Sequence, residues 1–280
     1  MTTVERGEGT ITIGGCWTYE WAQRRRPFIH PLATPSGVVL SRDAPDDHPW
    51  HHGLWFTVKF VGDDNFWEEM APYGVLRHDF PPDVIEDHDG SVVVSGALTW
   101  TRPDRTTVAL SEHRSFTHVP IDDDAYAIDL DTTLIPHADV RLDRTPFTTW
   151  GGYGGLAFRG RADLVDSQIL LDDGSGHDRV FGTPSRWSDL AGTVDGAPVG
   201  LALLDHPENP RHPTPVYGGA KLDNYGDGWS NLLNAAFLFH DGLDLAAGQH
   251  IRLRHRVLVH DGHWDASRLA DEWERWAGGR

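Results

Sequence analysis

Cysteine is almost absent from this sequence, since Cys16 is the only one in 280 residues. A single thiol excludes a disulfide within the chain and a metal site built from cysteines. Long apolar runs are also missing, because no stretch approaches the roughly eighteen apolar residues that indicate a membrane-spanning helix. The N-terminus, MTTVERGEGTITIGG, has charges and glycines where a signal peptide has an apolar segment. We therefore expect a cytoplasmic protein that does not act in a membrane.

Positive charge is scarce as well. The 24 Lys and Arg residues are outnumbered by 42 Asp and Glu residues, which gives a formal net charge of −18. Nucleic acids and anionic membranes repel a chain this acidic, so neither is expected as a partner. The charge favours uncharged or cationic small ligands. The sequence leaves the oligomeric state open, with a homodimer as one option.

Helical periodicity is rare, whereas apolar and polar residues alternate in many segments. The clearest strands are predicted at 91–100, 106–116 and 125–135. Further strands are predicted at 36–41, 54–60, 167–172, 199–204, 235–240 and 250–260. No linker, charge block or repeat divides the chain. We predict that residues 1–280 form one all-β domain, an antiparallel sandwich or barrel.

One helix is predicted, at about 265–277. Asp265 can cap its N-terminus and Gly278 ends it. The apolar stripe that includes Leu269, Trp273 and Trp276 predicts that the helix packs against a sheet.

The segment DDHPWHHGLWFT, residues 46–57, concentrates His48, His51 and His52 beside tryptophans. Its proline and glycine predict a turn that enters a strand. Three interpretations stay open: a metal site, an acid/base group, and histidines that are simply solvated or packed in the core. No fixed spacing such as HExxH supports a metal. Imidazole titrates near neutrality and aromatic rings line sugar pockets, which favours acid/base chemistry on a sugar.

Other segments carry polar side chains that could reach a ligand. LLDHPENPRHPTPVY, residues 203–217, predicts a strand followed by a proline-rich loop, and loops on a rigid scaffold often carry function. Glu112 and Arg114 lie two apart on one strand face, either as a surface ion pair or as an inward pair. The segment GGYGGLAFR lacks GxGxxG and so predicts a strand that ends at Arg159 rather than a nucleotide loop.

Three segments together resemble a known family. RPFIHPLATPSGVVLSRDAPDDHPWHHGLWFTVKFVGDDNFWEE, NPRHPTPVY and GQHIRLRHRVLVHDG are similar to signatures of the PmoA-like family, a bacterial domain of unknown function. Trp50 stands where that family usually has histidine, and His52 where it usually has arginine. The family's label refers to a methane monooxygenase subunit, which is a membrane protein, and the lack of a spanning segment excludes that role here.

The resemblance implies carbohydrate chemistry, and the strand pattern looks like the galactose mutarotase-like supersandwich, a large two-sheet antiparallel β-sandwich with a C-terminal helix outside it. We expect an enzyme of sugar or glycoside catabolism, an epimerase, lyase or hydrolase that acts by histidine acid/base proton transfer. The alternatives are a non-catalytic carbohydrate-binding protein and a metal-dependent lyase or oxygenase that uses the histidines. No cofactor is predicted, although a divalent metal stays possible.

The predicted site is a pocket on the concave face of a sheet, with the three histidines as one wall, Arg159 and the 205–217 loop opposite them, and Glu112 and Arg114 as the floor. The expected catalytic residues are His48, His51, His52, Glu112 and His212. The expected substrate-binding residues are Trp55, Trp67, Arg114, Arg159, Arg211 and Tyr217. No metal ligand is assigned. Since turn residues contribute little core, replacing His51 or His52 is expected to leave folding intact.

Overall fold

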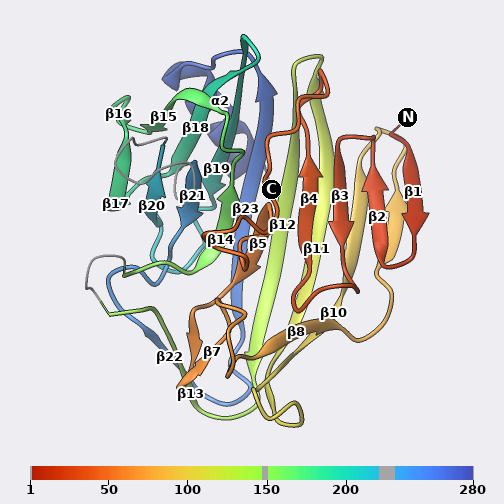
Figure 1. Cartoon of the computed structure of the whole chain (residues 1–280), viewed down its shortest axis with the longest axis vertical. Helices are drawn as coiled ribbons and strands as arrows, with labels where there is room; N and C mark the ends of the chain where they lie inside the picture. The colour runs from red at the N-terminus through yellow and green to blue at the C-terminus, as the bar shows by residue number, and fades with distance from the viewer. Residues whose placement is uncertain (1, 147–150, 221–230, 280) are drawn as a thin grey trace.

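The computed structural model describes residues 2–146, 151–220 and 231–279, in which two large antiparallel sheets pack face to face (Figure 1). The nine-stranded sheet has the order β1 (Val4–Gly7), β2 (Thr10–Ile13), β3 (Trp17–Glu20), β4 (Phe28–Leu32), β5 (Leu54–Thr57), β14 (Gly155–Arg159), β21 (Leu232–Ala235), β20 (Pro215–Gly219), β17 (Arg179–Pro184). The ten-stranded sheet has the order β16 (Gly176–His177), β15 (Val165–Leu171), β18 (Trp187–Val194), β19 (Ala197–Asp205), β23 (Ile251–Asp261), β12 (Ala125–Pro136), β11 (Val108–Asp122), β10 (Val92–Thr101), β8 (Val75–His78), and β9 (Asp83–Glu86) also pairs with β10. A small third sheet has the order β22 (Leu243–Leu245), β13 (Val140–Asp143), β6 (Phe60–Val61), β7 (Asp64–Asn65).

Alternation along the strands places one face of each large sheet in a shared core. Leu54 and Phe56 of β5 and Leu110 and Phe116 of β11 belong to the same buried cluster. Trp55, between Leu54 and Phe56, points to the opposite face, since successive side chains alternate across a strand. The prediction of an all-β, two-sheet antiparallel sandwich with a C-terminal helix is confirmed.

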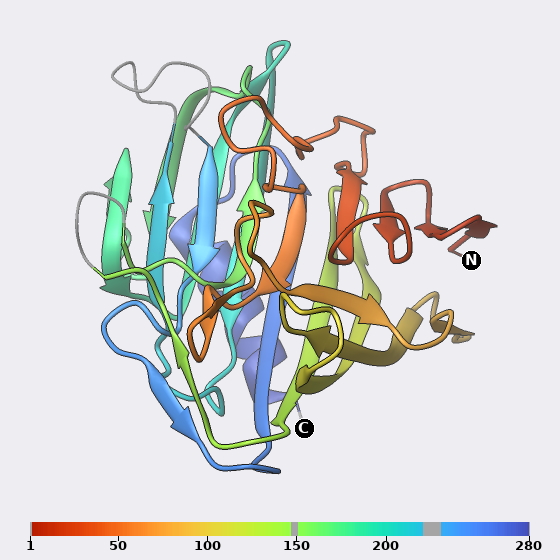
Figure 2. The same cartoon turned by 60° about the horizontal axis from the view of Figure 1, so that its bottom comes forward.

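The helix α2 (Ala266–Gly278) begins as predicted, with the Asp265 side chain accepting a hydrogen bond from the backbone N–H of Arg268 at 2.9 Å. It lies on the outer face of the ten-stranded sheet (Figure 2), where Leu269 is buried with Leu204, Leu258 and other apolar residues. In the described part of the chain, no helix has both the length and the apolar character needed to cross a membrane.

Two strand predictions were wrong. Residues 36–41 make only isolated bridges, Ala33 to Val39 and Ser41 to Gly160, because the segment turns at once around Gly37. The strand expected at 235–240 ends at Ala235, where Phe239 N–H bonds to Ala236 O in a turn.

Candidate active site

The predicted histidine cluster lies on the outer face of the nine-stranded sheet, away from the shared core. Trp55 of β5 is opposite Ala157 of β14, and both belong to a second apolar cluster separate from that core. The other members are Phe28, Trp67, Tyr217, Leu232, Ala236 and Phe239, with Trp50 and Tyr153 packed at its margin. The three histidines pack against the aromatic rings of this cluster and its margin.

The segment 44–53 folds as the turn that its proline and glycine predict. Ala44 N–H bonds to His51 O at 2.8 Å, and His51 N–H bonds to His48 O at 2.9 Å. Gly53 has φ +59°, and a Cβ there would lie 2.3 Å from Ile29 O, so this close approach requires glycine. The turn therefore fixes where the three imidazoles point.

His48 is oriented by the carboxylate next to it. Its Nδ1 donates to Asp47 Oδ2, and its side chain is 26% exposed. A carboxylate can only accept, so the proton on Nδ1 leaves Nε2 as the atom with a free lone pair when the ring is neutral. This aspartate–histidine pair has the arrangement of a general base.

His51 is held in the opposite way. Arg159 donates from Nη1 to His51 Nδ1 at 3.2 Å, and from Nη2 to Asp47 Oδ2, also at 3.2 Å. Because a guanidinium only donates, Nδ1 of His51 carries no proton and Nε2 carries it. Burial and the Arg159 charge hold the pKa of His51 well below its ordinary value, and burial lowers the pKa of Arg159 to about 10. His51 is thus a neutral imidazole that presents an N–H.

His52 is clamped by two carboxylates. Its Nδ1 donates to Asp43 Oδ1 at 2.6 Å and its Nε2 donates to Glu69 Oε1 at 3.2 Å. The ring is fully buried and stacks on Phe28, with centroids 4.8 Å apart. Both nitrogens are occupied, so this imidazole joins the turn to the segment that carries Glu69. Both side chains are buried, so the premise that these turn residues contribute little core is wrong, and the effect of replacing either one on folding stays a prediction.

A row of rings runs from the exposed histidine across the sheet face. His48 stacks on His51 at 4.7 Å, His51 on Trp55 at 5.0 Å, Trp55 meets Trp67 at 5.3 Å, and Trp67 meets Tyr153 at 5.1 Å. Tyr217 continues the row 6.1 Å from Tyr153. The row brings together four of the predicted substrate-binding or catalytic positions besides His48 itself.

Exposure along this row is uneven, and that decides which rings a ligand can touch. Trp55, Trp67 and Tyr217 are at most 2% exposed. They pack against the neighbouring rings of the row and do not present a ring face to a ligand. Trp50 and Tyr153 are only half-buried.

Glu112 and Arg114 occupy the shared core on the other side of the nine-stranded sheet. Glu112 accepts hydrogen bonds from Trp100 Nε1 and Thr132 Oγ1, both at 2.6 Å, and pairs with Arg114. Arg114 reaches Phe56 O at 3.4 Å. They are an inward pair, as one interpretation held, but they are sealed between the sheets and form no floor beneath the histidines.

His212 and Arg211 are not brought to the histidine cluster either. His212 donates from Nδ1 to Asp205 at 2.7 Å and stacks on Trp273 of α2, with ring centroids 6.0 Å apart. Arg211 donates to the carbonyls of Phe237, Asp241 and Gly242. Their partners give these two residues a structural role in fixing the 205–217 loop.

Several residues of the site escaped the sequence analysis, among them Asp47, Glu69 and Arg26. Arg26 is 3% exposed, and its Nη2 donates to Trp67 O. Its Nε lies 3.5 Å from Glu69 Oε1. Within the described residues, Arg26 Nη1, Arg159 Nε and Trp55 Nε1 are buried donors with no acceptor. A local sequence pattern cannot reveal a pair such as Asp47 and Arg159, because the two residues are 112 positions apart.

A second polar group lies at the Tyr153 end of the row. Tyr153 donates its hydroxyl proton to Glu68 Oε1 at 2.8 Å, and Glu68 also pairs with Lys59. Burial raises the pKa of Tyr153 and lowers that of Lys59. In the described ranges, no three His, Cys, Asp or Glu side chains are grouped so that they could hold a metal ion.

Comparison with protein families gives one match over nearly the whole chain, to a family of unknown function, DUF6807, at residues 10–274. The chain belongs to this family. This match does not test the resemblance to the PmoA-like family, which stays a prediction. No curated protein matches this DUF6807 member.

Among solved structures, the crystal structure of the GalM/aldose epimerase homologue from C. elegans is similar. The match covers 95% of this chain and 100% of that one, with 12% sequence identity and a TM-score of 0.38. A likeness at this level says nothing about what the DUF6807 chain acts on.

Proposed function

We propose that this protein is an enzyme that transfers protons on a sugar or keto-sugar, with His48 as general base and His51 as proton-bearing partner of the substrate oxygen. The observation that carries the proposal is the pair of stacked imidazoles held in opposite states by Asp47 and Arg159. Adjacent groups with opposite proton roles are what acid/base catalysis requires.

His48 supplies the base. Its Nε2 lone pair accepts a proton from a carbon beside a carbonyl or from a hydroxyl, while Asp47 stabilises the imidazolium that forms. The electron pair left on the substrate moves toward an oxygen. Asp47 also accepts a hydrogen bond from Arg159, and the same guanidinium donates to His51, so Arg159 connects the base pair to the second imidazole.

His51 supplies the hydrogen bond to that oxygen. Burial and Arg159 keep the ring neutral, so its Nε2–H stabilises the developing negative charge without adding a cation to the site. Whether the proton returns to the other face of the carbon, or a bond to oxygen breaks, decides between epimerisation and elimination. Hydrolysis uses the same base on a water molecule.

The surroundings support a sugar as the substrate. Trp50 packs edge-on against His48, with centroids 5.3 Å apart, and like Tyr153 it is half-buried, so these two rings are the ones offered to a sugar face. Trp55 and Trp67 then act by supporting His51.

The test uses the purified protein with a panel of reducing sugars, keto-sugars and simple glycosides in D2O. Proton NMR detects exchange of C–H protons and mass spectrometry detects new products. At least one substrate should turn over, and His48→Gln and His51→Gln should each reduce turnover about a hundredfold or more. The matched control is His88→Gln, an exposed histidine in the turn after β9, which should leave turnover unchanged.

Three results would contradict the proposal. Binding of sugars without turnover of any of them would indicate a non-catalytic carbohydrate-binding protein. Activity that needs a stoichiometric metal, shown by elemental analysis and loss with a chelator, would indicate metal-dependent chemistry. Turnover that survives in both histidine variants would place the chemistry elsewhere.

A further inference from the structure

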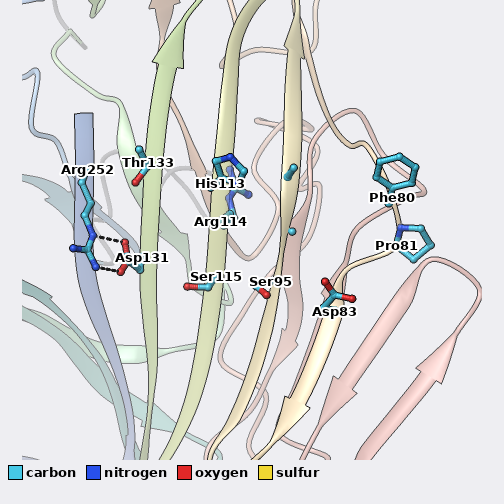
Figure 3. Close-up of a pocket in the computed structure, with 12 residues that line it drawn as sticks. Phe80, Pro81, Asp83, Ser95, His113, Arg114, Ser115, Asp131, Thr133 and Arg252 are labelled. Carbon is cyan, nitrogen blue, oxygen red and sulfur yellow. Dashed lines mark hydrogen bonds and ion pairs between the residues drawn. The ribbon is translucent and has the colours of Figure 1, made fainter. Parts of the chain in front are cut away.

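A hollow of about 640 Å³ lies on the outer face of the ten-stranded sheet (Figure 3). It uses residues of β11, β12 and β23 other than those that pack against α2. It is separate from the histidine cluster, which stands on the outer face of the other sheet. Its lining consists of Phe80, Pro81, Asp83, Ser95, Gly96, Ala97, His113, Arg114, Ser115, Asp131, Thr133 and Arg252, although the side chain of Arg114 pairs with Glu112 in the shared core. The volume falls within the range of about 300–1,000 Å³ that small-molecule sites occupy.

The strand register explains why the sheet is hollowed here. Ser95 of β10 is opposite Ser115 of β11, and Ala97 is opposite His113. Gly96 lies between them on β10 and has no side chain. Small side chains thus form the floor, and larger ones stand at its two sides.

The apolar side of the hollow is made by a break in the edge of the sheet. β8 and β9 both pair with β10. Of the four residues between them, Asp79 still donates its N–H to Ala97 O at 3.0 Å, but Pro81 and Pro82 have no N–H to donate, so the ladder is interrupted there. Asp79 anchors the break by accepting from Thr99 Oγ1 at 2.7 Å. Phe80 is left 79% exposed beside the hollow.

The opposite side is polar and charged. Arg252 donates from Nε to Asp131 Oδ1 at 2.8 Å and from Nη2 to Oδ2, and Figure 3 shows this pair across the floor from Phe80 and Pro81. Asp83 and His113 also line the hollow, and neither side chain has a hydrogen-bond partner among the described residues. Donors, acceptors and hydroxyls are therefore all available to a ligand.

This combination selects a class of ligand. Asp83 and Asp131, in a chain with net charge −18, disfavour an anion. No metal-ligand group occurs in the described ranges. A neutral saccharide fits, because its hydroxyls both donate and accept, while its C–H face can lie on an exposed aromatic ring.

We propose that this hollow is a second saccharide-binding site, specific for short neutral oligosaccharides and distinct from the His48–His51 site. Phe80 supplies the stacking ring, and Asp83, His113 and the Asp131–Arg252 pair bind hydroxyls. The proposal does not depend on catalysis at the histidines, since a bound chain would be held on the opposite side of the sandwich.

The experiment measures binding of maltotriose, cellotriose and xylotriose to the full chain by saturation-transfer NMR and isothermal titration, with glucuronate as the anionic comparison. At least one trisaccharide should bind more tightly than glucuronate. Phe80→Ala should weaken that binding about three- to tenfold, as loss of a ring contact does. Asp83→Ala should weaken it similarly, and urea unfolding should show both variants as stable as the parent.

Two controls separate this site from other surfaces. Ile85→Ala removes an exposed apolar residue of β9, 61% exposed and outside the lining, and should leave binding unchanged. His48→Gln should also leave it unchanged. Absence of binding to all three trisaccharides, binding insensitive to Phe80→Ala, or binding lost in His48→Gln would each overturn the proposal.

Discussion

Replacing His52 tests whether this buried imidazole holds the site together. His52→Ala removes hydrogen bonds to Asp43 and Glu69 and a stacked contact with Phe28. Removal of one partner from a buried charged group typically costs about 3–5 kcal/mol, because the remaining charges lose their compensation. Asp43 and Glu69 keep Arg24 and Arg26 as partners, which favours the lower half of that range.

The assay is equilibrium unfolding in urea, followed by tryptophan fluorescence and circular dichroism, with the free energy of unfolding taken from the linear extrapolation. His52→Ala should lower that free energy by about 3 kcal/mol or more. His88→Ala, at an exposed position, should change it by less than about 0.5 kcal/mol. A loss below about 1 kcal/mol for His52→Ala would show that the two carboxylates do not depend on this ring.

Further predictions concern the buried polar groups on the ten-stranded sheet. Burial lowers the pKa of His118 to about 4, and its Nδ1 accepts from Trp17 Nε1 at 3.2 Å, so the folded state resists protonation. The free energy of unfolding should therefore fall as the pH drops from about 6.5 toward 4. His118→Gln keeps an acceptor and should reduce that slope by up to about 1.4 kcal/mol per pH unit, measured by urea unfolding at several pH values. An unchanged slope would contradict this prediction. Asp205 accepts hydrogen bonds from His212 Nδ1 at 2.7 Å and from Thr214 N and Oγ1 at 2.8 and 2.9 Å. Asp205→Asn should therefore lower the free energy of unfolding in urea by about 3 kcal/mol, whereas Asp123→Asn, at an exposed position, should leave it unchanged. Equal effects of the two substitutions would contradict the role given to Asp205.

Much of the fold could be predicted from the sequence because strand alternation is a local signal. The pattern at 250–260 places Ile251 and Leu253 inward and Arg252 outward, as β23 has them. The same pattern fails at 36–41, since backbone pairing there depends on a distant partner and a turn at Gly37.

The site was predictable only in part. The density of imidazoles around His48 is visible in the sequence, and so is the strand that ends at Arg159. That Arg159 meets Asp47 and His51 follows from the pairing of β5 with β14, which no local pattern reveals. The error with Glu112 came from the same source, because alternation places it on a strand face but does not say which sheet covers that face.

The central claim is that His48 and His51 sit side by side in opposite proton states. The direct measurement is NMR of the protein labelled with ¹⁵N in its histidine rings, with each signal assigned by His48→Gln and His51→Gln. Between about pH 6 and 8, His51 should stay neutral with its proton on Nε2, as burial and Arg159 require, while His48 keeps its proton on Nδ1 beside Asp47. A His51 ring that titrates near pH 6.5, or that carries its proton on Nδ1, would contradict the account.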